Sequence, residues 1–383
     1  MRTCHFVCAS AVVMLLPPMA FRVLATSSSV DPFAFFQPSV TPTADDRSQL
    51  DQGNPVARVI VSQDPEVAVW AAVPVNIDGD RLVSWMHRIE ALKKSTYVLA
   101  IGRFSNPPRL EDLDDLSLDK DDTSDLAACR PAHCDFKLSA AEMAALQHAA
   151  DQPGGLQQHF HHLVLDRVNA YLSGARIGPY ADTANEVWPG QEFDQLLDHS
   201  PFLTMHAASF AESLRRPHTA SVPGVESFLY WSKERLGGKP TISVTDVRIL
   251  RGGDSSLPDV IVAGKQIFAT HYLNASLGVT ALVRGEPGRS NYLIYVNRSR
   301  LDMLRGRLAG IIRWYMQRRL KAEAANVLEG LRRRLESGEP PPIAVAYHGE
   351  RRIIAAGGVV RDRVEALSTA GSRLEGSTMH DRI

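Results

Sequence analysis

Alternating apolar and polar residues fill the stretch from Lys265 to Val283. Alternation with a period of two predicts a β-strand, and the length of this run predicts one bent strand with its kink at Gly278. A Glu-Pro-Gly turn lies within Arg284–Ser290, and Asn291–Asn297 then returns as the antiparallel partner of the long strand. The C-terminal half of the chain is therefore predicted to hold a curved antiparallel ribbon.

A long amphipathic helix is predicted to follow this ribbon, from Leu301 to Glu336. Pro340–Pro342 ends the helical pattern, because proline lacks the amide proton that a helix interior requires. The apolar positions of the helix recur at helical spacing and are Leu301, Leu304, Leu308, Ile311, Tyr315, Val327, Leu331 and Leu335.

Shorter strands and helices are predicted in the rest of the chain. Strand patterns occupy residues 67–77, 96–104, 227–232, 241–251 and 260–262, and helical patterns occupy 80–92, 139–149, 155–173, 191–197 and 207–214. We therefore predict a single α+β domain at 56–337, in which a curved antiparallel sheet packs on the long C-terminal helix. A helical insertion is expected at 139–215, and residues 338–383 are expected to form a poorly ordered tail.

The first 25 residues have the pattern of a secretory signal peptide. Arg2 supplies the positive end, Ala9–Leu16 the short apolar segment, and Val23–Ala25 a small-residue cleavage site. The apolar segment is much shorter than the roughly 20 residues of a membrane span. Residues 26–55 are rich in Ser, Thr, Pro and Asp, which predicts a disordered linker. We expect an exported bacterial-type protein, located in the periplasm or outside the cell.

Composition and charge narrow the classes of partner. Hydrophobic residues make up 44% of the chain and charged residues 22%, as in ordinary globular proteins. The 42 basic and 43 acidic side chains leave a formal net charge of -1, which argues against nucleic-acid binding. The C-terminal helix is locally basic, so contact with a membrane surface is an alternative to a simple solvated face.

Two of the four cysteines, Cys129 and Cys134, lie beyond the predicted signal peptide. In an oxidising compartment such a pair favours a disulfide, which here would pin a turn. Two thiolates alone do not complete a zinc site, and the spacing differs from the Cys-x-x-Cys of redox proteins. We therefore predict a structural disulfide.

Two segments raise the question of a metal site. Asp119–Asp122 resembles the start of a calcium loop but lacks its glycine and its distal glutamate, so a helix N-terminus is favoured. His159, His162 and Asp166 share one face of a predicted helix, which is compatible with metal ligation. Nothing nearby completes a ligand set, so a solvated polar face is the alternative. We expect neither a metal nor a cofactor.

Polar side chains also interleave with the apolar residues of the predicted sheet. His271, Tyr295, Asn297 and Arg298 lie on the ribbon, and Trp231 lies on an upstream strand. Because buried polar groups need partners, these residues form either a satisfied network or the polar contacts of a ligand pocket. In a pocket, Arg298 would bind an acidic head group. Neighbouring residues of a strand face opposite sides, so the whole set cannot serve one site.

This succession of elements resembles the START-like, or helix-grip, lipid-binding architecture. The resemblance covers Glu226–Glu336, with an opening strand and helix at Val67–Lys94, and the helices at 139–215 depart from it as an insertion. In that family the sheet wraps around the last helix and encloses an apolar ligand cavity. From the residues alone, a solid core filled by the helix is equally simple.

These features favour an exported, non-catalytic protein that binds a hydrophobic or amphipathic, lipid-like small molecule between the sheet and the last helix. The sequence has no Gly-x-Ser-x-Gly elbow, no His-Glu-x-x-His helix and no Gly-Lys-Ser/Thr phosphate loop. A catalytic triad is defined by geometry, so an exported hydrolase with a histidine-centred site is an alternative. A second alternative is an envelope interaction protein without a ligand pocket.

Overall fold

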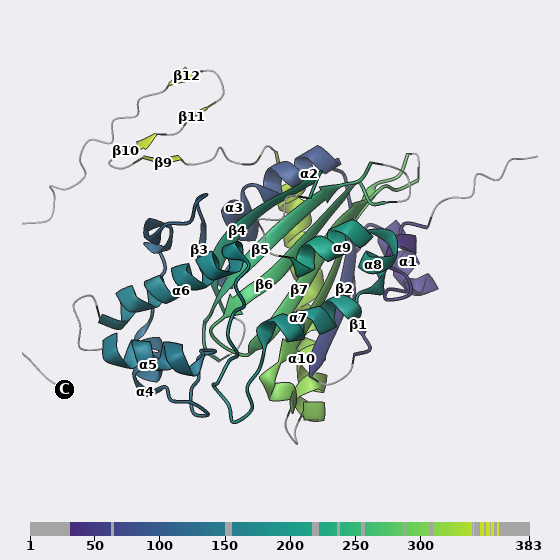
Figure 1. The fold of residues 1–383 in the computed structure, drawn as a ribbon. Coiled ribbons are helices and arrows are strands. Elements are labelled where there is room, and N and C mark those ends of the chain that lie inside the picture. Colours follow the sequence, from purple (N-terminus) through teal and green to yellow (C-terminus); the bar gives the residue numbers. More distant parts are fainter. Residues whose placement is uncertain are drawn as a thin grey trace, which may run out of the picture. The chain divides into compact units, whose positions relative to one another are not determined.

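Eight antiparallel strands form one open, curved sheet at the centre of the molecule (Figure 1). Their order is β1-β2-β8-β7-β6-β5-β4-β3, so β1 and β3 are the edges. The strands are β1 (Val56–Ile60), β2 (Glu66–Val75), β3 (Val98–Arg103), β4 (Val225–Glu234), β5 (Thr241–Arg251), β6 (Val260–Ala269), β7 (Leu273–Val283) and β8 (Asn291–Leu301). The predicted α+β class, with a curved antiparallel sheet and a C-terminal helix, is confirmed.

The computed structural model describes residues 31–62, 65–149, 155–216, 222–235, 238–253, 257–286, 288–305, 309–338 and 340, and four short strands beyond them. These are β9 (Val345–Tyr347), β10 (Glu350–Arg352), β11 (Ile354–Ala355) and β12 (Gly358–Val359), which fall within the predicted tail. The signal peptide predicted at 1–25 lies outside the described residues. No helix of the described chain is both long and apolar enough to cross a bilayer.

Helices cover both faces of the sheet (Figure 1). One face, which we call the α10 face, carries α2 (Gly79–Met86), α3 (Ile89–Lys93) and α10 (Ala309–Glu336). The opposite face, which we call the insertion face, carries the helices that lie between β3 and β4. These are η2 (Leu110–Leu113), α4 (Lys120–Ala128), α5 (Ala140–Ala149), α6 (Gly155–Ser173), α7 (Pro189–Asp198), α8 (Pro201–His206) and α9 (Ala208–Arg215). The inserted helices thus begin soon after β3, earlier than residue 139.

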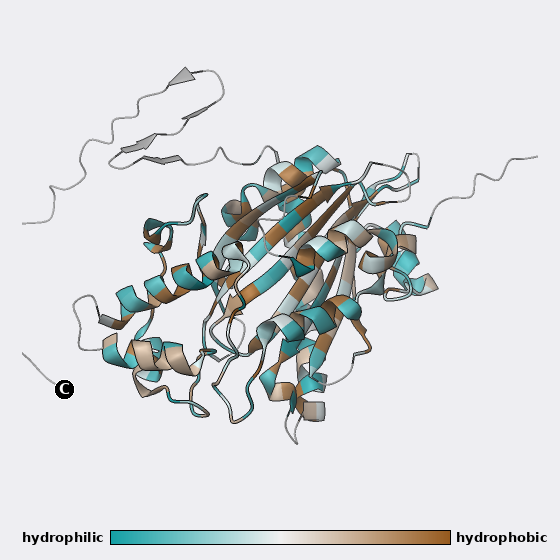
Figure 2. Cartoon of the chain, viewed as in Figure 1, coloured by the Kyte–Doolittle hydropathy of each residue, from teal (hydrophilic) through white to brown (hydrophobic). Residues whose placement is uncertain are grey.

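Successive residues of a strand point to opposite faces of the sheet, so each strand contributes side chains to both helical layers. Hydrophobic (brown) and hydrophilic (teal) residues follow one another along the strands in Figure 2. On β8, Ile294 and Val296 join the apolar cluster of the insertion face. Their neighbour Leu293 joins the cluster of the α10 face. This pattern follows from the period of two and fixes which side chains reach each layer.

The run from Lys265 to Val283 is two strands, so the prediction of one bent strand is wrong. β6 ends at Ala269, the chain reverses over Thr270–Tyr272, and β7 pairs antiparallel with β6. The reversal contains neither glycine nor proline; Tyr272 itself adopts the left-handed backbone conformation, with φ 62°. Gly278, the expected kink, lies within β7 opposite Gly264.

Residues 34–51, which the composition assigned to a linker, form η1 (Ala34–Phe36) and α1 (Ala44–Asp51). Phe33 and Phe36 are buried, with ring centroids 5.9 Å from Trp70 of β2 and 5.2 Å from Phe202 of α8, respectively. A capping box between Thr43 and Asp46 starts α1. Aromatic burial therefore anchors this segment, despite its polar composition.

α10 packs chiefly over β2 and β1. Leu331 and Leu335 of the predicted apolar stripe face the sheet, but Ile311, Tyr315 and Val327 are exposed. Because the sheet is twisted, the side of α10 that contacts it changes along the helix. A single straight line of apolar positions therefore misses some of the contacting residues. The residues that pack inward are Ile312, Met316, Ala324, Leu328, Leu331 and Leu335.

Candidate ligand-binding site

The central strands carry polar side chains on the α10 face that are only half-buried. Residues of the same strands that point to the insertion face, such as Leu277, Val279 and Val296, are buried. A central strand packed equally on both faces would be buried on both, so the α10 face is less completely covered and solvent reaches it. The half-buried polar positions are Ser243, Thr245, Ser276, Thr280, Tyr295, Asn297 and Ser299. We call these residues, with Tyr230, Ser232, Glu234 and Gln266, the polar floor.

The strand register aligns the polar floor into rows. Ser276 lies opposite Ser299, and Thr280 lies opposite Tyr295. Thr245 lies between Gln266 and Tyr230, its partners on the two neighbouring strands. Directly opposed residues share a face, so these side chains come together although they are distant in sequence.

Two glycines lie opposite one another within the polar floor. Gly264 of β6 pairs with Gly278 of β7. A Cβ at Gly278 would lie 3.5 Å from the Tyr295 ring, and one at Gly264 would lie 3.4 Å from the Thr245 methyl group. Because neither position has a side chain, the sheet surface here is bare apart from Tyr295 and the hydroxyls around it.

A lysine from α3 closes the floor at the β4 end. The Lys93 Nζ donates to Glu234 Oε1 at 2.6 Å and to the Tyr230 hydroxyl at 3.1 Å. Ser232 Oγ donates to the same carboxylate oxygen at 2.6 Å and lies 3.3 Å from Ser243 Oγ. The ion pair is partly exposed, with side chains that are 29% and 16% accessible to solvent.

The charges of this pair stabilise one another. Burial alone would raise the pKa of Glu234, but the adjacent Lys93 ammonium lowers it below its ordinary value. Burial would likewise lower the pKa of Lys93, but Tyr230 and Glu234 raise it. Both groups are therefore charged at neutral pH and present a fixed dipole at this end of the floor.

We expect a Glu234→Gln variant to lose about 1–3 kcal/mol of stability at pH 7, the usual contribution of a hydrogen-bonded charge. A carboxyl whose folded pKa is lowered stabilises the fold above its unfolded pKa of about 4.3, and this contribution disappears as the pH falls through the folded value. Urea denaturation of wild type and variant should therefore show a gap between their free energies of unfolding, and this gap should close in acid. Glu286→Gln, at an exposed site, should show almost no gap. A gap for Glu234→Gln that did not change with pH would refute this assignment.

A hydroxyl and amide network occupies the β7–β8 end of the floor. Ser299 Oγ donates to Asn297 Oδ1 at 2.9 Å and lies 2.9 Å from Ser276 Oγ. Asn297 Nδ2 also contacts Ser276 Oγ at 3.4 Å. The serines and the amide keep further hydrogen-bonding capacity.

Tyr295 lies between the two ends, with Lys93 and Asn297 as electrostatic neighbours. It packs against the apolar cluster of the α10 face, and Ala91 of α3 and Ala324 and Leu331 of α10 pack against the same cluster. Burial raises the pKa of the Tyr295 hydroxyl, while Lys93 and Asn297 act in the opposite direction. The phenol is thus neutral at physiological pH and acts as a hydrogen-bonding group.

Of the residues that the sequence singled out, the structure brings Tyr295 and Asn297 together on the polar floor. Arg298 lies on the insertion face, where its Nη1 donates to the buried Glu66. Trp231 also lies there, completely buried, and its Nε1 donates to Asp112 O at 2.8 Å. These two side chains do not reach the floor.

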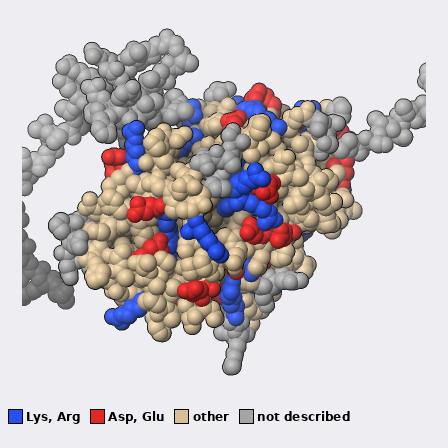
Figure 3. Space-filling view, viewed as in Figure 1, with Lys and Arg blue, Asp and Glu red and all other residues tan. Residues whose placement is uncertain are grey.

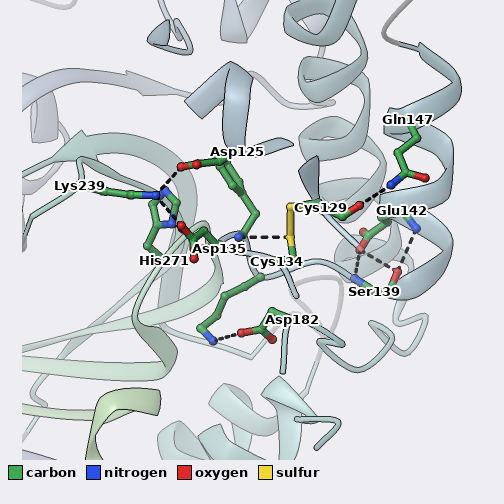
Figure 4. The surroundings of a disulfide bond; sticks show 12 residues. Asp125, Cys129, Cys134, Asp135, Ser139, Glu142, Gln147, Asp182, Lys239 and His271 are labelled. Carbon is green, nitrogen blue, oxygen red and sulfur yellow. Dashed lines mark hydrogen bonds and ion pairs between the residues drawn. A yellow bond between two sulfur atoms is a disulfide. The ribbon is translucent and has the colours of Figure 1, made fainter. Parts of the chain in front are cut away.

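His271 lies in the reversal between β6 and β7, against the inserted helices (Figure 4). Its Nδ1 donates to Asp135 O at 2.7 Å, and its ring packs on Phe136 with a centroid distance of 4.5 Å. The other ring nitrogen lies 3.7 Å from Asp122, whose pKa burial would raise but His271 and Lys233 hold down. His271 is 3% exposed and is separate from Tyr295 and Asn297 on the polar floor.

Cys129 and Cys134 lie at disulfide distance, with their sulfur atoms 2.03 Å apart (Figure 4). The bond joins the end of α4 to the segment before α5, as the turn prediction required. Lys239 pairs nearby with Asp125 and Asp135. The disulfide and these pairs hold the start of the insertion.

Within the described residues, no group of three His, Cys, Asp or Glu side chains is arranged to hold a metal. His159 Nδ1 donates to Gly155 O in its own helix, at 2.9 Å. His162 and Asp166 lie on the same helix, α6, without such a cluster around them. Asp119 and Asp122 form the capping box of α4, the helix-start role that their sequence favoured.

A second buried polar cluster lies on the insertion face. Tyr171 donates to Asp246 at 2.6 Å, and Arg248 pairs with the same carboxylate at 2.9 Å. Burial lowers the pKa of nearby Lys265 to about 8, and its Nζ donates to Leu214 O. The cluster ties α6 and α9 to the sheet.

On the surface of the face shown in Figure 3, basic (blue) and acidic (red) side chains intermingle.

Sequence reasoning missed most of the polar floor, including Tyr230, Ser232 and Ser276, and it missed Lys93 beside the floor. The available signal was polar residues in phase on four separate strands: Ser232/Glu234, Ser243/Thr245, Ser276/Thr280 with Gly278 between them, and Asn297/Ser299. In-phase polar positions of this kind predict a hydrated face once the strand order is known.

Comparisons with known proteins leave the family open. No family model and no curated protein matches the chain. The crystal structure of TTHA0849 from Thermus thermophilus is similar at 12% identity and a TM-score of 0.22, over 39% of this chain and 90% of that one. The di-domain ARO/CYC StfQ from the steffimycin biosynthetic pathway is similar at 13% identity and a TM-score of 0.21, over 81% and 95%. Such low TM-scores support no argument from either neighbour.

Proposed function

We propose that this chain is an exported, non-catalytic protein that binds an amphipathic small molecule on the polar floor, between the sheet and α10. The observation that carries the proposal is the half-buried polar face of the central strands, opposite a fully buried face. A few oriented polar groups beside apolar walls are typical of small-molecule sites. Export rests on the predicted signal peptide and is compatible with the cysteine pair.

The connectivity supports a START-like arrangement for this site. From β2, the chain continues through α2 and α3 to the far edge strand β3, then through five consecutive neighbours, β4 to β8, and ends in α10. β8 pairs with β2, so the last long strand of the sheet lies beside an early one, and the sheet remains open. The inserted helices occupy the opposite face and leave the α10 face to the ligand.

The polar groups of the floor indicate which chemical class of ligand it would bind. Hydroxyl groups, two amides and two phenols favour a molecule with several hydroxyl or carbonyl groups. The Lys93–Glu234 pair offers both a donor and an acceptor at one end. Apolar residues of α10 and α3 in the cluster against which Tyr295 packs would contact a hydrophobic body. A purely hydrocarbon ligand would leave these polar groups unsatisfied, which narrows the lipid-like expectation to an amphipathic molecule.

We expect Tyr295→Phe to weaken ligand binding about tenfold, because it removes one hydrogen bond and keeps the ring. Native mass spectrometry of protein purified from its own host would identify a bound molecule, which then serves in titrations. Tyr292→Phe is a matched control, since Tyr292 lies on the same strand and points to the insertion face. Equal effects of both variants, or protein without any bound or titratable small molecule, would refute the proposal.

The hydrolase alternative places the chemistry at His271. Its Nδ1 is engaged by Asp135 O, and Asp122 lies beside its other nitrogen. No serine, threonine or cysteine side chain is among its hydrogen-bond partners in the described chain. Turnover of an ester that is lost in His271→Ala, with the fold retained, would favour that alternative over simple binding.

A further inference from the structure

The first half of α10 has an apolar face that points away from the sheet. Ile311, Trp314 and Tyr315 are 67%, 60% and 57% exposed. Their spacing of three and four residues places them on one side of the helix, whereas Ile312 and Met316 pack inward. We call these three exposed residues the outer patch.

The outer patch lies in a strongly basic stretch. Between Asp302 and Glu323 the chain has six basic residues and no acidic one: Arg305, Arg307, Arg313, Arg318, Arg319 and Lys321. The Arg318 guanidinium lies 5.7 Å from the centre of the Trp314 ring. Arg318 and Lys321 are exposed, so their charge is available to a partner.

Another apolar side chain lies close to this end of the helix. Arg313 Nη1 donates to Ser62 O at 3.0 Å, which places the β1–β2 connection beside α10. Val61, the residue before Ser62, is 97% exposed. The β1–β2 connection therefore places an exposed aliphatic side chain beside the Arg313 side of the helix.

We propose that the outer patch docks on an anionic lipid surface. Tryptophan and tyrosine favour the membrane–water interface, and arginine and lysine favour phosphate head groups. A second copy of this chain, bound patch to patch, would bring the two basic stretches together and be opposed by their repulsion. An anionic surface instead complements the charge of the exposed Arg318 and Lys321. This proposal does not depend on the ligand site.

The test is sedimentation of the purified protein with vesicles. We expect binding to vesicles of phosphatidylglycerol and phosphatidylcholine, little binding to phosphatidylcholine alone, and weaker binding in high salt. Trp314→Ala should lower the partition coefficient at least about tenfold, and Arg318→Gln or Lys321→Gln about fivefold each. Val327→Ala, which also changes an exposed apolar residue of α10, should leave it unchanged.

Equal binding to both kinds of vesicle, or binding that Trp314→Ala and Arg318→Gln leave unchanged, would overturn the proposal. So would a dimer, seen by analytical ultracentrifugation without lipid, that Trp314→Ala abolishes, because a second copy would then cover the patch. Ligand binding by the polar floor should be normal in Trp314→Ala, which separates the two proposals.

Discussion

Replacing Glu66 by alanine is expected to destabilise the protein by about 3–5 kcal/mol. Glu66 is completely buried on the insertion face, where it accepts from Arg298 Nη1 and from His199 Nδ1, the latter at 2.6 Å. Its loss leaves the Arg298 guanidinium buried without a counter-charge, which costs far more than the pair itself contributes. Urea denaturation of wild type and Glu66→Ala at neutral pH measures the difference.

A double variant separates the cost of an orphaned charge from that of the pair. Glu66→Leu combined with Arg298→Met removes both charges and keeps apolar volume, so we expect its stability within about 1–2 kcal/mol of wild type. His199 is 42% exposed and regains water as its partner. If the double variant were as unstable as Glu66→Ala, the orphaned-charge explanation would be wrong.

The same double variant tests where the ligand binds. Arg298 was a candidate anchor for an acidic head group, yet it points away from the polar floor. We therefore expect the double variant to bind the ligand with wild-type affinity. Loss of binding in a folded double variant would move the site to the insertion face.

Local pattern was sufficient for most of the sheet. Sequence patterns predicted strands at β2, β3, β4, β5 and β8, but none at β1, and they merged most of β6 with β7. The period of two also separates Asn297 from Arg298, which occupy opposite faces of β8. It does not say which face carries α10, because that depends on strand order. Lys93 joins Tyr230 and Tyr295 only through contacts between distant parts of the chain, for which a single sequence has no signal.

Two sequence patterns led to wrong predictions. The reversal at Thr270–Tyr272 keeps the alternating pattern because a tyrosine, rather than a glycine, adopts the left-handed conformation. α10 has apolar residues on two sides, so a single stripe drawn through Ile311 and Tyr315 selected the exposed side. In both places the pattern is present in the sequence, but tertiary packing decides which residues form a turn and which face the sheet.

Replacing Trp231 by alanine is expected to cost about 3–5 kcal/mol, the usual range for a fully buried large aromatic residue. The indole is completely buried among residues of the insertion, and its Nε1 donates to Asp112 O at 2.8 Å. Truncation would leave a cavity between the sheet and the inserted helices and an unsatisfied carbonyl group. The expected result is a large loss of stability, measured by urea denaturation.

Gly102 provides a sharper version of this test, because a Cβ there would lie 2.7 Å from the Trp231 ring. Gly102→Ala alone should cost about 1–3 kcal/mol through this clash. In the Trp231→Ala background the clash is absent, so the second substitution should cost almost nothing, and the two effects should not add. Additive effects would show that the indole does not lie against Gly102. Strong coupling, with ligand binding preserved in the folded Gly102→Ala variant, would assign Trp231 to anchoring the insertion rather than to the ligand site.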